Sequence, residues 1–184
     1  ILNDVFGIQS RGGCSCAGPY GHRLLGIDIE RSHEFEREIT HGCEGIKPGW
    51  VRVNFNYFIS EPVFEFILEA VSLVARYGYR LLVDYRFDAS TGIWHHVNGQ
   101  PAPPLRLMDV SYRSGKLEYR SAHAREPEWA LESHLDEARR MLTRRLIGRT
   151  PRIDEPALST DFETLRWFPL PREVLARLGR EEQN

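Results

Sequence analysis

The most regular pattern in this chain is an alternation of apolar and polar residues between positions 51 and 57. The apolar positions are Val51, Val53, Phe55 and Tyr57, and the polar positions are Arg52, Asn54 and Asn56. Because successive side chains of a strand point to opposite faces, this alternation predicts a strand with one apolar face. The opposite face carries an arginine and two amides, whose direction the pleat would fix.

A helix is predicted directly after this strand. Ser60 is a favourable N-cap residue, Pro62 suits the first turn, and Gly78 is typical of a helix end. Between them, apolar residues recur at helical spacing, at Phe64, Ile67, Leu68, Val71, Val74 and Ala75. This periodicity predicts that one side of the helix packs on the sheet.

Weaker patterns predict the remaining elements. Residues 1–6 are typical of a helix end, residues 7–10 of a short strand, and Ser32 of an N-cap for a helix ending near His41. Farther along, extended segments are expected at 80–87, at 93–97 and within 105–120.

The last third of the chain combines a helix with a segment that has no clear period. Pro127 opens a long amphipathic helix. After Pro151 the sequence predicts an irregular tail, whose aromatic and proline residues dock on this chain or on a partner.

These elements predict an α/β fold of the α+β kind, with helices packed on one face of a small, mostly antiparallel sheet. Residues 1–78 would form the core domain. Residues 79–184 would form an extension with extended segments, one long helix and the irregular tail.

Composition narrows the classes of function. The chain has 184 residues, of which 41% are hydrophobic and 27% charged, as in a soluble protein with a real core. A net charge of −2 argues against nucleic acid as the main partner, and no apolar run approaches the length that spans a membrane. Three cysteines do not suggest a disulfide framework, so a reducing cytoplasm is the expected compartment.

Candidate reactive residues lie in a glycine-rich segment between Arg11 and His22. It contains Cys14 and Cys16, and glycines at positions 12, 13, 18 and 21 allow sharp turns. A thiol near cationic groups is biased toward the reactive thiolate. The alternative is two small buried residues in a turn. No metal site is expected, because the Cys-x-Cys spacing differs from the usual zinc hook.

The run from Arg11 to Ala17 resembles the Arg-x-Gly-His-His-Cys-Ala loop of cysteine desulfurases and selenocysteine lyases. The longer run also resembles the Arg-x-Gly-Cys-x-Cys-x-x-Gly loop of molybdenum cofactor sulfurases. These enzymes belong to the class V aminotransferase-like family and use pyridoxal phosphate. The resemblance covers residues 1–77 and implies the carboxy-terminal small domain of that fold, a small amino-acid substrate, and a homodimer for the intact enzyme.

The resemblance also implies roles for single residues. Cys16 takes the place of the cysteine that attacks the sulfur of the cofactor-bound substrate cysteine and leaves alanine. Cys14 stands where that loop has a histidine, so it could carry the reactivity instead. Arg52 takes the place of the arginine that binds the substrate α-carboxylate; the alternative is a structural arginine paired with an acidic neighbour.

Three further residues are candidates for the same site. Arg11 could either hold the loop or face the site. His22 could carry protons, because its ordinary pKa lies near neutrality, or it could be a hydrogen-bonded structural residue. Asn54 shares the expected strand face of Arg52 and could orient the substrate.

The two lysines limit what this chain can do alone. Pyridoxal phosphate needs a lysine for its Schiff base, but Lys47 and Lys116 both lie in expected turns. We therefore expect a carboxy-terminal fragment that is inactive alone, with the cofactor bound mainly by a missing large domain. A transaminase, epimerase or lyase of the same superfamily, or a non-catalytic interaction domain, are the alternatives.

Overall fold

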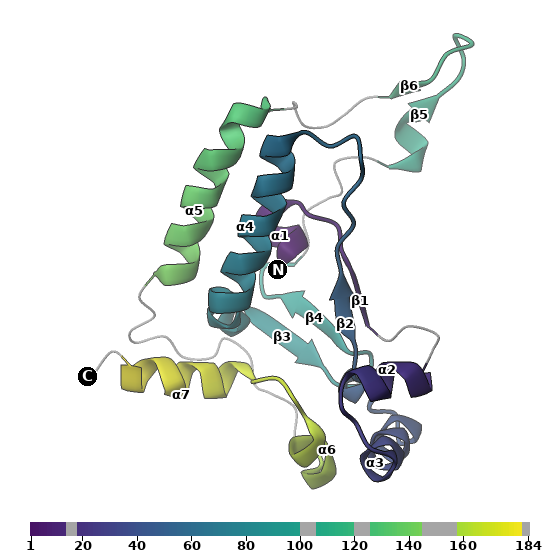
Figure 1. Ribbon diagram of the computed structural model, residues 1–184, viewed down its shortest axis with the longest axis vertical. Helices are drawn as coiled ribbons and strands as arrows, with labels where there is room; N and C mark the ends of the chain where they lie inside the picture. The colour runs from purple at the N-terminus through teal and green to yellow at the C-terminus, as the bar shows by residue number, and fades with distance from the viewer. Residues whose placement is uncertain (14–17, 100–105, 120–125, 145–157, 182–184) are drawn as a thin grey trace.

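The computed structural model describes residues 1–13, 18–99, 106–119, 126–144 and 158–181 (Figure 1). Its described part combines helices with antiparallel strands, which confirms the α+β class. The expected single sheet is replaced by three separate two-stranded ribbons, which pair β1 with β2, β3 with β4, and β5 with β6. None of the helices within these ranges is long and apolar enough to cross a membrane.

The ribbon of β1 (Arg11–Gly13) and β2 (Trp50–Arg52) is shorter than the sequence predicts. The expected strand at residues 7–10 is displaced to β1, and β2 stops at Arg52. Because β1 offers only three residues for pairing, the alternating stretch beyond Arg52 has no ladder to join. Phe55 instead packs edge-on against Phe64 of α4, with ring centroids 5.2 Å apart.

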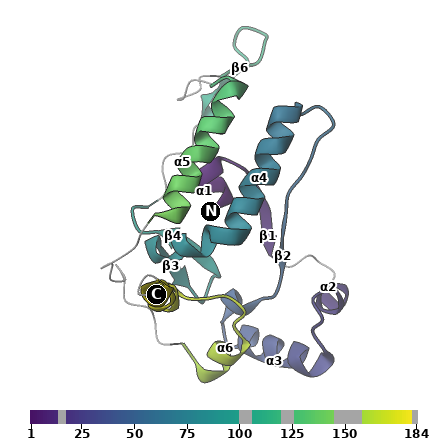
Figure 2. The same cartoon turned by 60° about the vertical axis from the view of Figure 1, so that its left-hand side comes forward.

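A first core lies among α1 (Leu2–Phe6), α4 (Glu61–Tyr77) and α5 (Leu131–Thr143), which Figure 2 shows side by side. The predicted helix after Ser60 is confirmed as α4. The buried residues of this core are Phe6, Phe66, Ala70, Leu73, Leu81, Tyr85, Ala138 and Leu142. The core therefore draws on both sides of the boundary expected at residue 78.

A second core joins the tail to the middle of the chain. Its buried residues are Phe35, Ile46, Phe87, Phe162, Leu165 and Leu170. They come from α3 (Ile29–Thr40), η1 (Glu44–Ile46), β3 (Tyr85–Asp88), α6 (Thr160–Leu165) and the turn that follows α6. For residues 158–181 the prediction of an irregular tail is wrong, because Ser159 caps α6 and Pro171 begins α7 (Pro171–Glu181). The aromatic tail docks on this chain.

The segment between α4 and β3 also differs from its prediction. Residues 80–84 belong to the 3₁₀ helix η2 (Gly78–Asp84) rather than to a strand. Leu81 enters the first core, whereas Val83 packs with Val174 and Leu178 in a third cluster. The alternation of apolar residues thus reflects burial against two different clusters.

The remaining elements complete the described chain. They are α2 (Gly18–Leu24), β4 (Ile93–His96), η3 (Leu107–Asp109), β5 (Val110–Ser111), β6 (Glu118–Tyr119) and η4 (Glu128–Ala130). Figure 1 shows the β5–β6 ribbon at one end of the molecule and α6 at the other.

Candidate functional site

The β1–β2 ribbon brings together two of the predicted site residues. Arg11 lies directly opposite Arg52 in the antiparallel register. Directly opposite residues of such a pair extend from the same face of the ribbon, with Cβ atoms about 4.5–5.5 Å apart. Two segments that are distant in sequence therefore present two arginines side by side.

Both arginine side chains are exposed, and their charges are not neutralised by the described chain. Among the residues that the structure describes, neither the Arg11 nor the Arg52 side chain forms a hydrogen bond or an ion pair. Like charges directly opposite each other destabilise a strand pair. An anion bound between the two guanidinium groups would relieve this repulsion.

Trp50 lies next to described residues on both sides of the cysteine segment, which is residues 14–17. Gly13, which precedes the segment, is the register partner of Trp50 on β2. Gly21 of α2, which follows the segment, packs on the indole ring, since a Cβ there would lie 3.2 Å from Trp50 Cζ3. Cys14 and Cys16 lie outside the described residues, so their roles stay predictions.

His22 links α2 to α3. Its Nδ1 atom forms a hydrogen bond of 2.8 Å with Ser32 Oγ, and its ring lies 6.5 Å from the Phe35 ring. The expected N-cap at Ser32 is wrong, because Asp28 accepts the hydrogen bond from the Arg31 N–H at the start of α3. Ser32 lies inside the helix, where its hydroxyl is available to the imidazole.

A groove of about 850 Å³ runs between α2 and α3. Its lining includes His22 and Ser32 together with apolar side chains such as Phe35 and Ile39. Gly18, the first described residue after the cysteine segment, lines it as well. The histidine–serine pair and Gly18 therefore line the same groove.

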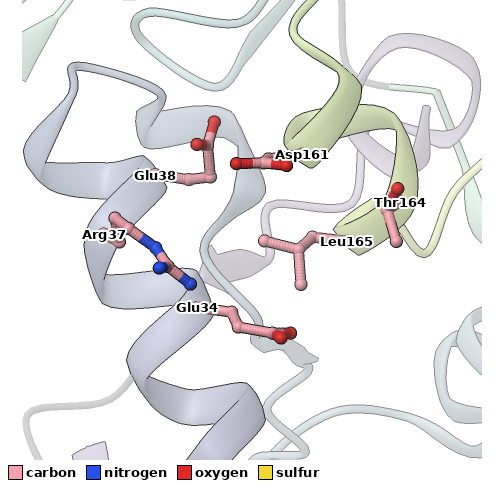
Figure 3. A pocket seen from close by; sticks show the side chains of 6 residues that line it. All are labelled: Glu34, Arg37, Glu38, Asp161, Thr164 and Leu165. Atoms are coloured by element: carbon pink, nitrogen blue, oxygen red, sulfur yellow. The ribbon is translucent and has the colours of Figure 1, made fainter.

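A smaller pocket of about 240 Å³ lies between α3 and α6 (Figure 3). It is lined by Glu34, Arg37, Glu38, Asp161, Thr164 and Leu165. No sequence motif marks it, because its residues come from two segments far apart in the chain. Within the described ranges, no group of three or more His, Cys, Asp or Glu side chains could hold a metal ion.

Cys43 has an environment that suppresses its reactivity. Burial raises the pKa of the Cys43 thiol. The negative charge of the Glu38 carboxylate and a hydrogen bond to it raise this pKa further. Glu38 itself is 5% exposed and accepts a hydrogen bond from the Ser159 hydroxyl at 3.0 Å. Because the thiolate is the nucleophilic form, Cys43 is a poor candidate for catalysis.

Other predicted site residues are placed less favourably. Asn54 lies beyond the end of β2, so no strand pleat aligns it with Arg52 as expected. Lys47 is exposed and paired with Glu44, and Lys116 is exposed in the turn between β5 and β6. Neither lysine lies on the β1–β2 ribbon or on α2.

Comparisons with family models, with curated proteins and with solved structures find no match to this chain.

Proposed function

We propose that this chain is the substrate-binding part of a pyridoxal-phosphate-dependent enzyme of the class V aminotransferase-like family. The observation that supports this proposal is the pairing of Arg11 with Arg52. Residues 11–13, which begin the run that resembles the family loop, and the arginine strand are thereby parts of one ribbon. A chance sequence resemblance would not require that pairing.

In this proposal Arg52 binds the α-carboxylate of an amino acid. A guanidinium group offers two parallel N–H donors that match the two oxygens of a carboxylate. Arg52 is exposed and has no competing acidic partner among the described residues. Its place on a hydrogen-bonded strand holds its backbone at a fixed position opposite Arg11.

The residues of this chain do not fit the covalent attachment of the cofactor. Attachment needs a lysine that can form a Schiff base. Lys47 is held by Glu44, and Lys116 lies in a turn of the β5–β6 ribbon. We therefore assign the cofactor lysine to another part of the enzyme and expect the chain alone to be inactive.

Cys16 is the proposed nucleophile, with Cys14 as the alternative. Its thiolate would attack the sulfur of a bound cysteine substrate, so that an S–S bond forms while the C–S bond breaks. The carbon then gains a proton and leaves as part of alanine, and the enzyme keeps the sulfur as a persulfide. A free thiol of this kind suits the cytoplasm, where cysteines stay reduced.

The carboxylate role can be tested by titrating the full chain with L-alanine, the product of such a reaction. The Trp50 indole N–H signal in NMR spectra reports binding beside Arg52. Arg52→Lys keeps the positive charge but loses the two parallel N–H donors of the guanidinium group. We therefore expect alanine to bind about five-fold more weakly. Arg76→Lys, at an exposed position of α4, is the matched control and should bind as the wild type does. Equal alanine affinity in Arg52→Lys and wild type would refute the carboxylate role.

A further inference from the structure

When Arg52 binds the α-carboxylate, Arg11 on the opposite strand is left without an anionic partner. One α-carboxylate satisfies one guanidinium fork, whereas the register places Arg11 directly beside it. Both side chains are exposed, and neither guanidinium group forms a hydrogen bond or an ion pair with the described residues. The ribbon therefore presents two positive charges where a single carboxylate would neutralise one.

The backbone next to the arginines leaves room for a ligand. Gly13 lies on the same face of the ribbon as Arg11, and a Cβ built there would meet no atom within 4 Å. Gly13 also has a positive φ of 108°, a conformation that side-chain-bearing residues rarely adopt. A ligand held by the two guanidinium groups could thus approach the strand closely without displacing a side chain.

We infer that this ribbon selects amino acids whose short side chain carries a second negative charge. Arg52 would bind the α-carboxylate and Arg11 the side-chain anion. This inference rests on the proposed function and narrows its substrate class. The separation of directly opposite Cβ atoms, about 5 Å, suits two anionic groups that are close together, as in aspartate. A cysteine substrate would carry such a charge only as its thiolate.

The test compares L-aspartate with L-asparagine, which has nearly the same shape but a neutral side chain. Both are titrated into the full chain at constant ionic strength and pH 7, with the Trp50 indole signal as the readout. We expect aspartate to bind about five-fold more tightly than asparagine, as one additional exposed ion pair would give. Arg11→Gln should abolish this difference, and Arg76→Gln on α4 should preserve it.

The outcomes separate this inference from the proposed function. If aspartate and asparagine bind equally, and Arg52→Gln weakens both, the second-charge inference is overturned while the carboxylate role stands. If Arg52→Gln changes the binding of neither ligand, both proposals are overturned. Inorganic phosphate that binds as tightly as aspartate would also overturn the inference, since the ribbon would then recognise charge alone. Backbone amide spectra of each variant show that the fold is retained.

Discussion

Gly45 occupies a position in the second core where no side chain fits. Its N–H donates a hydrogen bond of 2.9 Å to the Ala89 carbonyl, which ties η1 to the β3–β4 hairpin. A Cβ at this position would lie 2.4 Å from Phe87 Cζ and 3.1 Å from the Ala89 oxygen. The Phe87 side chain is closely surrounded, with the rings of Trp94, Phe168 and Phe162 at centroid distances of 4.9, 5.1 and 6.1 Å.

Gly45→Ala should therefore destabilise the protein by overpacking. Carbon atoms in contact prefer separations of about 3.5–4.0 Å, so Phe87 would have to move by more than about 1 Å. Overpacking of a close-packed core costs about 1–3 kcal/mol. We expect a loss near the top of that range, about 2–3 kcal/mol in the free energy of unfolding, because Phe87 is only 6% exposed.

Urea unfolding followed by tryptophan fluorescence measures this change. Gly179→Ala in α7 is the control, because the added Cβ meets nothing within 4 Å. It should raise the free energy of unfolding by about 0.5–1 kcal/mol through helix propensity. A Gly45→Ala variant as stable as the wild type would refute the described packing around Phe87.

Two further predictions concern polar contacts that join distant elements. The Tyr85 hydroxyl donates a hydrogen bond of 2.6 Å to Asp4, which lowers the pKa of the Asp4 carboxyl, so Tyr85→Phe should cost about 1–2 kcal/mol. The stability that this hydrogen bond contributes is present above the ordinary aspartate pKa and is lost as pH falls through the lowered value. Urea unfolding at pH 7 and at pH 3 should therefore show a smaller cost of Tyr85→Phe at pH 3. An unchanged cost would contradict this prediction. Arg166 joins α6 to α7 through bonds of 2.6 Å to Glu163 and 2.5 Å to Glu173. Arg166→Lys keeps the charge but loses the fork, so amide exchange in α7 should accelerate several-fold, and unchanged exchange would refute the link.

The sequence predicts elements well where local signals agree. The N-cap position of Ser60, Pro62 in the first turn and the apolar spacing all indicate α4, which forms as expected. The strand expected at 93–97 also forms as β4, after a turn in which Gly92 has a φ of 72°. In these cases neighbouring residues alone supply the information.

Predictions fail where a distant partner decides the structure. Alternation continues to Tyr57, but β2 ends at Arg52 because β1 is short. Asp28 and Ser32 are both good N-cap residues, and the sequence does not show that Ser32 bonds His22 instead. The same limit applies to the site, since the sequence names both arginines but only the register shows that Arg11 faces Arg52.

The proposed nucleophile is tested most directly by the alkylation rates of the three thiols in the folded chain, measured against pH. Peptide mass spectrometry after iodoacetamide treatment resolves Cys14, Cys16 and Cys43. Cys43 is the internal reference, because burial and the Glu38 carboxylate raise the pKa of its thiol. The same reaction in urea should show similar rates for all three.

We predict that Cys16 reacts fastest at pH 7, with a pKa below the ordinary thiol value of about 8.5. Arg11 and His22, which flank the segment, are the cationic groups expected to favour its thiolate. Faster alkylation of Cys14 than of Cys16 would move the role to Cys14. Alkylation of both at a rate no higher than that of Cys43 would contradict the presence of a catalytic thiol in this chain.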